Sequence, residues 1–529
     1  METSPFPLLS LLIFLPVVAG ISLLRIRNKH RILSVALGVA VAELLLSLIL
    51  LGLFDPNQDG MQFVEQHSWI PTLNIDYLLG VDGLSVLFVP LTALITVAVI
   101  LASRRSIKTL SSLYFALLLF LEGITIGVYC TLDLALFFLF WELTLPPLFF
   151  LISLWGIGVH RRYAALKYVL FMLTGGVLLL FGFVLLGLNH ANETGIAAPA
   201  GLSFNYMELL QTPIPLATQA IVFLLLFFGF AIKAPLFPFH VWLPTMAMEG
   251  PASITAIIVG LKLGLFGIIR FAIPLAPQAA SQYFVLMMLL GAIGAIYGAL
   301  IALKQTNLRR MLAYSSISHA GFVLIGAATF NIQGIQGAVF QLFNFGIVAS
   351  GIFLIAGFLQ YRLGSTELTA LGGAARPMPI LASLFFILGL ASIGVPGTNG
   401  FAAEHLIVIG AFKAHIGMGL AVLLGIILSA AYYLVFYQKA FLGPVTHATV
   451  KEAVDLRSRE YWIAGTMVSL ALLLGLFPQQ VLNTTDKTLQ GWVARVETSP
   501  VAENNNTAEK ILAQKNHYDR TSNPNHYSY

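Results

Sequence analysis

Long apolar stretches, separated by short polar segments, fill most of this chain. Each is about 20 residues long, which is the length that an α-helix needs to cross the hydrocarbon core of a bilayer. The pattern predicts an all-α, polytopic membrane protein with about fourteen transmembrane helices surrounded by lipid. The predicted helices cover residues 6–24, 32–54, 83–102, 111–130, 134–155, 163–188, 218–240, 253–273, 283–302, 311–330, 335–359, 378–411 (broken), 416–437 and 462–482.

Two of these stretches contain helix breakers. GFAIKAPLFPFH (229–240) holds Pro235 and Pro238, and ASIGVPGTNGFAAE (391–404) holds Pro396. Proline removes a backbone donor and clashes with the preceding turn, so we expect an interrupted helix at each place. Non-helical backbone at membrane depth survives only inside protein or beside a water-filled cavity, and paired interruptions are typical of transporters built from inverted repeats.

The two breaks also predict how the chain is organised. About five spans separate them, an odd number, so the two halves would have opposite orientations, as in an inverted repeat. We expect three helices in residues 1–110, a first five-helix repeat in 111–273 and a second, inverted one in 283–437. A loop and a last helix would follow in 438–482. The polar, Asn-rich residues 483–529 read as a flexible tail or a strap that binds a partner.

Composition and charge placement agree with a membrane protein. Hydrophobic residues make up 58% of the chain and charged residues 10%, whereas a soluble domain carries about 25% charged residues. Lys and Arg gather in alternate loops, as expected on the cytoplasmic side, while loops 55–82 and 190–217 are acidic and contain neither. This alternation places both termini opposite the basic loops. It also explains the net charge of +5 without nucleic-acid binding.

Ionisable side chains lie inside several of the apolar stretches. A charge at the bilayer centre costs at least about 2.5–3.5 kcal/mol, so such residues are functional candidates. Buried lysines, carboxylates and histidines can exchange protons near neutral pH. The pattern therefore predicts a proton relay through coupled charges on different helices. The candidates are Glu122, Glu142, Lys233, Lys262, His319 and Glu404.

Each candidate also has a structural reading. Glu142 and Lys233, which we expect to be the coupled unit that passes protons to Lys262, could instead be an ion pair that fixes helix register. His319, the expected shuttle towards Glu404, could be satisfied by the serines around it. Three other charges in apolar stretches also have a structural reading. For Glu122 both readings stay open, and for Glu43 the structural one is favoured. Lys167 could simply extend its ammonium group to the membrane interface.

Other chemistry finds little support in the sequence. The single cysteine, Cys130, excludes an internal disulfide and a cysteine-ligated iron–sulfur cluster within this chain. No phosphate loop, dinucleotide fingerprint or metal-ligand spacing occurs. We therefore expect no metal and no cofactor in this chain. Gly260, Gly264 and Gly267, beside Lys262, predict close helix packing.

An ordered series of motifs closely resembles the antiporter-like subunits of respiratory complex I and its relatives. The similarity is greatest to chain 4, the middle antiporter-like subunit, of the cyanobacterial and chloroplast NAD(P)H-quinone oxidoreductase, and it covers about residues 70 to 480. The motifs are GVDGLS (80–85), WELTLPPLFFLISLWG (141–156), KAPLFPFHVWLP (233–244), GLKLGLFGIIRF (260–271), LRRMLAYSSISHAGF (308–322) and VPGTNGFAAE (395–404).

Position by position, the resemblance implies roles for the buried charges. Glu142 and Lys233 would be the coupled pair of the first half-channel. The other roles would fall to Lys262 as the central lysine, His319 as the connecting histidine, Glu404 as the terminal acid of the second half-channel and Glu122 as a second glutamate on the preceding helix.

The resemblance also implies an activity and partners. The chain would be a proton-translocating subunit of an NAD(P)H/ferredoxin-plastoquinone oxidoreductase, with no redox centre of its own. Plastoquinone and iron–sulfur clusters would lie on partner subunits, which include other antiporter-like and small membrane subunits and a peripheral electron-transfer arm. The expected location is the cyanobacterial thylakoid membrane.

The sequence departs from the family pattern at two places. Thr245, Met246 and Ala247 stand where many members have Asp-Ala-His, and Asn344 and Phe345 stand where many have a histidine. Water near Asn344 could then carry protons between the halves. The divergence resembles the variants used for CO2 uptake, which would add a carbonic-anhydrase-like partner. Two alternatives stay open: an Mrp-type cation/proton antiporter subunit and a structural subunit that has lost transport.

Overall fold

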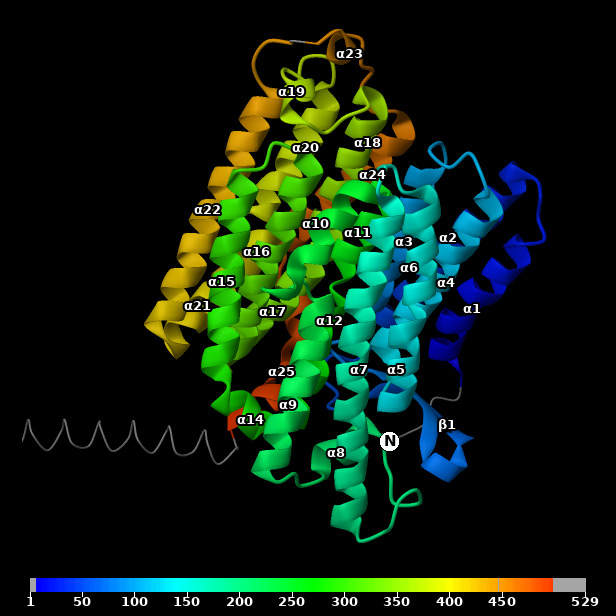
Figure 1. Ribbon diagram of the computed structural model, residues 1–529, viewed down its shortest axis with the longest axis vertical. Helices are drawn as coiled ribbons and strands as arrows, with labels where there is room; N and C mark the ends of the chain where they lie inside the picture. The colour runs from blue at the N-terminus through cyan, green and yellow to red at the C-terminus, as the bar shows by residue number, and fades with distance from the viewer. Residues whose placement is uncertain (1–5, 446, 498–529) are drawn as a thin grey trace, which may run out of the picture.

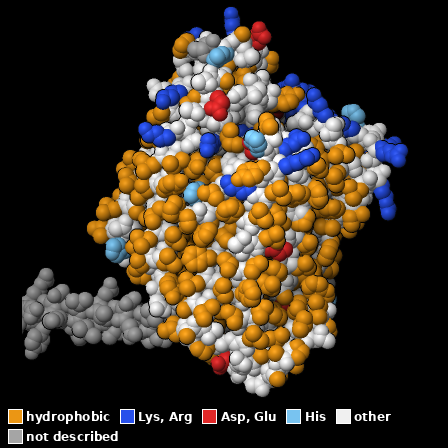
Figure 2. Space-filling model, in the orientation of Figure 1, with side chains coloured by type: hydrophobic (Ala, Val, Ile, Leu, Met, Phe, Trp, Pro, Cys, Tyr) orange, Lys and Arg blue, Asp and Glu red, His pale blue; other side chains and the backbone are white. Residues whose placement is uncertain are grey.

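A bundle of helices, most of them running along the long axis, makes up the molecule (Figure 1). The computed structural model describes residues 6–445 and 447–497. Apolar side chains cover its flanks, and Lys and Arg side chains gather at the end where α19 and α23 lie (Figure 2). This distribution agrees with a belt of lipid around the flanks and with the basic loops predicted at one end.

The chain begins with two helices, a hairpin and a third helix. Glu65 of the hairpin accepts hydrogen bonds from the backbone of Leu9 and Ser10, so it caps the first turn of α1. Because the hairpin is antiparallel and short, it adds little to a mainly helical fold, but the apolar periodicity did not predict it. The elements are α1 (Leu8–Leu23), α2 (Lys29–Leu53), β1 (Gln62–Ile70), η1 (Pro71–Leu73), β2 (Ile75–Val81) and α3 (Phe88–Ser103).

The next elements form the first half of the bundle. The predicted break in this half is confirmed, since α9 ends at Lys233 and the chain resumes a helix only after Pro238. The elements are α4 (Ser111–Cys130), α5 (Leu134–Leu143), α6 (Leu145–Trp155), α7 (Arg161–Thr194), α8 (Tyr206–Gln211), α9 (Leu216–Lys233), η2 (Phe239–Val241), α10 (Trp242–Glu249), α11 (Ala252–Leu261), α12 (Leu263–Gly267), the π-helical η3 (Ile268–Ala272), α13 (Ile273–Leu275) and α14 (Pro277–Gln282).

The second half contains the other predicted break, which is also confirmed. Here α20 ends at Ser392 and α21 begins at Asn399. The elements are α15 (Phe284–Leu303), α16 (Leu308–Ala328), α17 (Ile332–Asn344), the π-helical η4 (Phe345–Ala349), α18 (Ser350–Leu363), α19 (Leu368–Leu371), α20 (Pro379–Ser392), α21 (Asn399–Ala414), α22 (Ile416–Phe441), α23 (Ala448–Lys451), α24 (Ser458–Leu476) and α25 (Gln479–Glu497).

Helices occupy all the segments for which the sequence predicts spans. Within the described residues, ten helices are long and apolar enough to cross a membrane, or up to eleven if the bent pair of α24 and α25 is one span. Three more, α1, α3 and α20, are apolar but shorter. The count of about fourteen spans and the inverted symmetry of the two halves stay predictions.

The predicted polar tail begins inside a helix. The predicted polar tail was to begin at residue 483, but α25 continues to Glu497. Val481, Leu489, Trp492 and Val496 form the buried stripe of this otherwise polar helix, so packing rather than composition makes it helical. The rest of the predicted tail, 498–529, lies outside the described residues.

Candidate functional site

The first predicted pair lies where two helices end. Glu142 is close to the end of α5, and Lys233 is the last residue of α9. Lys233 Nζ donates a hydrogen bond to Thr144 Oγ1 at 2.9 Å and lies 3.8 Å from the centre of the Trp141 ring. The charges of Glu142 and Lys233 interact, but the described residues contain no direct ion pair between them. Each charge can therefore bias the other without being locked to it.

Two glycines make room for the carboxylates at the two ends of the site. A Cβ added at Gly176, on α7, would lie 2.0 Å from Glu142 Oε1. A Cβ added at Gly394, in the break between α20 and α21, would lie 2.3 Å from Glu404 Oε2, and this glycine has a φ of +68°. Side chains at either position would therefore push a carboxylate aside.

Lys262 occupies a third break, which the sequence did not predict. It separates α11 from α12 and has a left-handed conformation, with φ 40° and ψ 44°. Such a conformation is uncommon and costly for a residue with a Cβ. The Lys262 Nζ donates to Ser316 Oγ at 2.6 Å, and Tyr129 donates its hydroxyl to the carbonyl of Leu261 at 2.5 Å. The break turns this lysine from the first half towards α16 of the second.

Close packing beside Lys262 is confirmed for its three neighbouring glycines. A Cβ at Gly264 would lie 2.3 Å from the backbone nitrogen of Ala234, directly after Lys233. At Gly260 it would overlap the hydroxyl of Ser350 on α18, and at Gly267 the ring of Phe230 on α9. The two lysine-bearing breaks are therefore in direct contact.

A small cavity connects these two lysines. Its volume is about 30 Å³, which exceeds the roughly 10–15 Å³ that one water needs. It has hydroxyl and ammonium groups in its wall, so a water there would find several partners. The residues around it include Leu121, Thr125, Thr144, Tyr168, Lys233 and Lys262.

His319 and Glu404 meet in the second half. His319 Nε2 lies 3.5 Å from Glu404 Oε1 and 2.9 Å from the carbonyl oxygen of Ser392, the last residue before the second break. His319 Nδ1 lies 2.9 Å from the carbonyl of Ser315. The Ser315 hydroxyl also lies 3.4 Å from Nδ1, so both ring nitrogens have polar neighbours. The predicted serine neighbour and the predicted acid are thus both present.

A second cavity of about 30 Å³ lies between Ser316 and His319, which both line it. Ser316 also accepts the hydrogen bond from Lys262, so this serine connects the lysine to the cavity. Asn344 also lines it, and its Oδ1 has no hydrogen-bond partner among the residues the structure describes. An orphaned amide oxygen beside a space of this size suits a bound water.

Glu122 is not brought into this line. It is buried in α4, and the charged group with which it interacts is Glu43 of α2, not Lys233 or Glu142. Its helical neighbours Leu121 and Thr125 line the cavity between the two lysines. The sequence predicted Glu122 correctly as buried but could not give its partner.

The chain shares its sequence pattern and fold with proteins of one family. The family described as NADH:quinone oxidoreductase/Mrp antiporter, TM matches residues 131–429. NADH-quinone oxidoreductase subunit M of Rickettsia prowazekii is 36% identical over 484 residues, which cover 90% of this chain and 96% of that protein.

This chain belongs to the NADH:quinone oxidoreductase/Mrp antiporter family. It is a membrane-arm, antiporter-like subunit of the subunit M type. A chain of respiratory complex I from Thermus thermophilus has a TM-score of 0.84 and 32% identity, covering 92% of this chain and 99% of its own length. A chain of the Mrp complex from Dietzia shares the fold, with a TM-score of 0.80 and 23% identity over 92% of this chain and 98% of its own.

One departure from the family pattern has a structural partner. Lys167 Nζ donates a hydrogen bond to Thr245 Oγ1 at 3.0 Å, so this lysine binds across to α10 as well as lying near a helix end. Thr245 offers a neutral hydroxyl, so the Lys167 charge meets no opposite charge at this contact.

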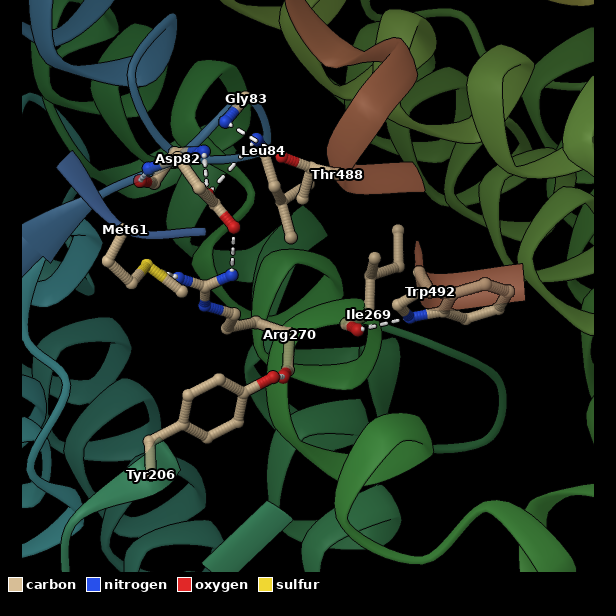
Figure 3. Close-up of polar contacts among 10 residues, drawn as sticks. Met61, Asp82, Gly83, Leu84, Tyr206, Ile269, Arg270, Thr488 and Trp492 are labelled. Carbon is tan, nitrogen blue, oxygen red and sulfur yellow. Dashed lines mark hydrogen bonds and ion pairs between the residues drawn. The ribbon is translucent and has the colours of Figure 1, made fainter. Parts of the chain in front are cut away.

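A buried ion pair that the sequence did not single out lies at the end of the Lys262 helix. Arg270 in η3 pairs with Asp82 at 2.5 Å, and both side chains are buried (Figure 3). Tyr206 donates its hydroxyl to the Arg270 carbonyl at 2.9 Å. Arg270 is a charge within an apolar stretch, so the rule that found the other candidates would also have found it.

Helix α25 joins the same cluster from the C-terminal end of the chain. Trp492 donates its indole N–H to the carbonyl of Ile269 at 2.9 Å, and the backbone N–H of Gly83, next to Asp82, donates to Thr488 Oγ1 at 3.0 Å (Figure 3). Arg495 donates to the carbonyl of Pro274 at 2.7 Å. Side chains from α25 therefore hold backbone groups on both sides of the ion pair.

Metal chemistry has no site in the described part of the chain. No three His, Cys, Asp or Glu residues there are grouped as a metal ion would require. Cys130 is buried and has no disulfide partner.

Proposed function

We propose that this chain translocates protons as part of a quinone-reducing complex, through Glu142, Lys233, Lys262, His319 and Glu404. The observation that supports this most is the pair of small cavities, one between the two lysines and one between Ser316 and His319. Together with the direct contacts they give an alternating series of ionisable groups and water-sized spaces. Protons can hop along such a series, from one ionisable group through a water to the next.

The chemistry of each step follows from the local contacts. In the first half, the hydroxyl of Thr144 and the Trp141 ring stabilise a protonated Lys233, and the nearby Glu142 charge adds to this. When Glu142 becomes neutral or moves, Lys233 loses part of that support and releases a proton to the cavity. Lys262 accepts it there, and the second cavity carries it towards His319.

In the second half, the exchange is between His319 and Glu404. At 3.5 Å between Nε2 and Oε1, a small rotation of either side chain brings the two atoms within hydrogen-bond distance. Glu404 lies just after the break between α20 and α21, where the chain can admit water. It would then release the proton from the path.

The direct test is proton pumping by the reconstituted complex. We expect Lys233→Ala and Glu142→Gln to lower the number of protons moved per electron, because each removes one group of the coupled pair. An unchanged ratio in both variants would contradict the proposal and would favour a structural subunit that has lost transport.

A second candidate is a cation/proton antiporter without redox coupling. The shared fold with a chain of an Mrp complex supports it. Sodium-dependent proton exchange by the purified chain would favour this function. Copurification with quinone-oxidoreductase subunits in mild detergent would favour the first.

The finer predictions from the sequence also belong to this proposal. They are plastoquinone as the acceptor, iron–sulfur clusters and quinone on partner subunits, a cyanobacterial thylakoid location and a role in CO2 uptake. The predicted role in CO2 uptake rests on Thr245–Ala247 and Asn344–Phe345, where the sequence departs from the pattern of the resembled family. A carbonic-anhydrase-like protein among the copurifying subunits would support it, and its absence from an intact complex would count against it.

A further inference from the structure

Helix α2 carries a buried glutamate, Glu43, whose carboxylate has no hydrogen-bond partner among the described residues. Most of the helix faces outward, with exposed Leu45, Leu48 and Leu53. One stripe is buried, and Glu43 lies in the middle of it with 0% of its surface exposed. The other members of the stripe are Ile32, Ala36, Ala40, Ser47 and Leu50.

Glu43 lies on a helix that packs against α4, which carries a second buried carboxylate. Glu122 of α4 is 1% exposed, and the charges of the two groups interact. Within the described ranges, none of the four carboxylate oxygens has a hydrogen-bond partner. α1, α2 and α4 lie side by side at one edge of the bundle (Figure 1).

The helices packed around Glu43 bring no positive charge to it. Residues 8–23 of α1 and 88–103 of α3 contain no titratable side chain. α4 contributes Cys130, whose thiol is within electrostatic reach of Glu43, and Tyr129, whose hydroxyl is already bonded to Leu261. Its remaining titratable side chain besides Glu122 is Tyr114, which bonds to Ser103.

Two carboxylates cannot both keep a negative charge in such a place, because like charges repel and burial penalises each of them. One proton between them removes one charge. It also supplies an O–H donor, which can form a hydrogen bond once the two side chains turn towards each other. A buried pair of this kind holds a proton and gives it up when its surroundings change.

The pair is also next to the path described above. Leu121 and Thr125, on the same turns of α4 as Glu122, line the cavity between Lys233 and Lys262. A rotation of the Glu122 side chain around its helix would bring the carboxyl group towards that cavity.

We propose that Glu43 and Glu122 form a proton-binding carboxyl pair at the edge of the bundle, which exchanges its proton with the cavity between Lys233 and Lys262. In the transfer within the pair, the O–H bond of one carboxyl group breaks as an O–H bond forms on the other, and the pair keeps one proton and one negative charge. The exchange with the cavity rests on the proposed function, whereas the pair itself does not.

The test is infrared difference spectroscopy on the intact complex, which records the C=O stretching band of a protonated carboxyl group. Because the carboxyl group left by either single change is still buried without a positive charge beside it, we expect Glu43→Gln and Glu122→Gln each to keep one such band at a shifted frequency, and the double variant to lose it. Ser47→Ala, one turn along the same buried stripe, is the matched control and should keep the band. Glu43→Asp retains a carboxyl group and should shift the band rather than remove it.

Proton pumping then tests the exchange. Glu43→Gln should lower the number of protons moved per electron, while Ser47→Ala leaves it unchanged. An infrared band that keeps its frequency in both Gln variants, or that survives in the double variant, overturns the pair. If the band shifts but pumping is normal in Glu43→Gln and lowered in Lys233→Ala, the pair is outside the path and the exchange is overturned. Normal pumping in both Lys233→Ala and Glu142→Gln would instead overturn the proposed function and leave the pair standing.

Discussion

At the scale of single residues, the space around Glu142 and Glu404, rather than hydrogen bonding, determines where their carboxylates lie. Glu142 and Glu404 each have a carboxylate oxygen without a hydrogen-bond partner in the described part of the chain. Each also lies against a glycine, Gly176 in one half and Gly394 in the other. The space left by the missing Cβ is therefore part of the site. Substitutions at these glycines can move a charge without removing it.

We expect Gly176→Ala to lower proton pumping while leaving the fold intact. The new methyl group would occupy the position of Glu142 Oε1, and a carboxylate at the end of a flexible side chain can move aside. Alanine also favours a helix interior by roughly 0.5–1 kcal/mol over glycine. The measurements are protons moved per electron and thermal stability of the complex. Gly38→Ala, where the methyl group would meet nothing, is the control; equal pumping in both variants would contradict the expectation.

The hydroxyl of Ser316 offers a second test at this scale. It accepts the 2.6 Å hydrogen bond from Lys262 Nζ, and hydrogen bonds to charged groups contribute about 1.5–3 kcal/mol. Ser316→Ala should therefore weaken the binding of a proton at Lys262 and slow pumping. Ser318→Ala removes a hydroxyl from the same helix that bonds to the carbonyl of Ala295, and it should pump normally. A similar loss in both variants would point to a packing effect on α16.

At the scale of elements, the two lysines share one kind of position. Lys233 is the last residue of α9, and Lys262 follows the last residue of α11. The carbonyl groups at a helix C-terminus favour a cation there by about 0.3–1 kcal/mol, and by up to about 2 kcal/mol when partly buried. Lys233 benefits from such carbonyl groups, since its Nζ also donates to the carbonyl of Trp141 near the end of α5. Lys262 also directly precedes α12, and the N-terminal dipole of that helix opposes the effect.

The contacts of α25 lead to a prediction about stability. Trp492→Phe keeps an aromatic ring beside Phe330 but loses the hydrogen bond to the Ile269 carbonyl. A lost hydrogen bond of this kind costs about 1 kcal/mol, and leaving a buried carbonyl unpaired can cost more. We expect a lower unfolding temperature, measured on the purified complex. Trp462→Phe, at a side chain that is 69% exposed in the chain alone, should have a much smaller effect.

Replacing the acid of the buried ion pair should be more costly. Asp82→Asn leaves Arg270 buried without its opposite charge, and such losses typically cost about 3–5 kcal/mol. The side chain of asparagine can still accept the hydrogen bonds that Asp82 receives from the backbone of Leu84 and Ser85. A stability equal to that of the native protein would show that the pair contributes little. Its thermal unfolding should therefore be compared directly with that of Trp492→Phe.

Much of the element scale could be predicted from the sequence. Apolar length gave the helical segments, and Pro235, Pro238 and Pro396 gave two of the breaks. The break at Lys262 could not be predicted, because no proline stands there and the conformation depends on Ser316 and Tyr129 from distant helices. Likewise, α25 is polar in composition and becomes a helix only through the surface on which its stripe packs.

The candidate site was predictable to a similar degree. A charge in an apolar stretch identified the buried groups, and the same rule would have included Arg270. Which buried charges contact one another depends on how helices that are far apart in the sequence pack face to face. The sequence therefore gave no means of pairing Glu122 with Glu43, and the structural reading of Glu43 rested on the lack of a visible partner.

At the scale of the whole molecule, the proposed path would cross between the halves. Glu142 and Lys233 belong to the first half and His319 and Glu404 to the second, and the contact of Lys262 with α16 joins them. Basic loops mark one end of the molecule, as Figure 2 shows, and the hairpin and α8 lie at the other (Figure 1).

This arrangement of the ends can be tested by labelling. Cys130 is buried and is the one cysteine of the sequence, so introduced cysteines report on their own positions. We expect a membrane-impermeant thiol reagent to reach Lys451→Cys from one side of the membrane and Asp59→Cys from the other. The unsubstituted protein should remain unlabelled. Reaction of both variants from the same side would contradict the predicted topology.

The left-handed break at Lys262 has a consequence for how the molecule fluctuates. A helix whose ladder of backbone bonds is interrupted opens locally at a lower free energy than a continuous one. Amide hydrogens around Lys262 should therefore be replaced by deuterium sooner than those in the middle of α16, although both are deeply buried. Lys262 would then be recognisable in heavy water as a quickly exchanging site inside a slowly exchanging bundle.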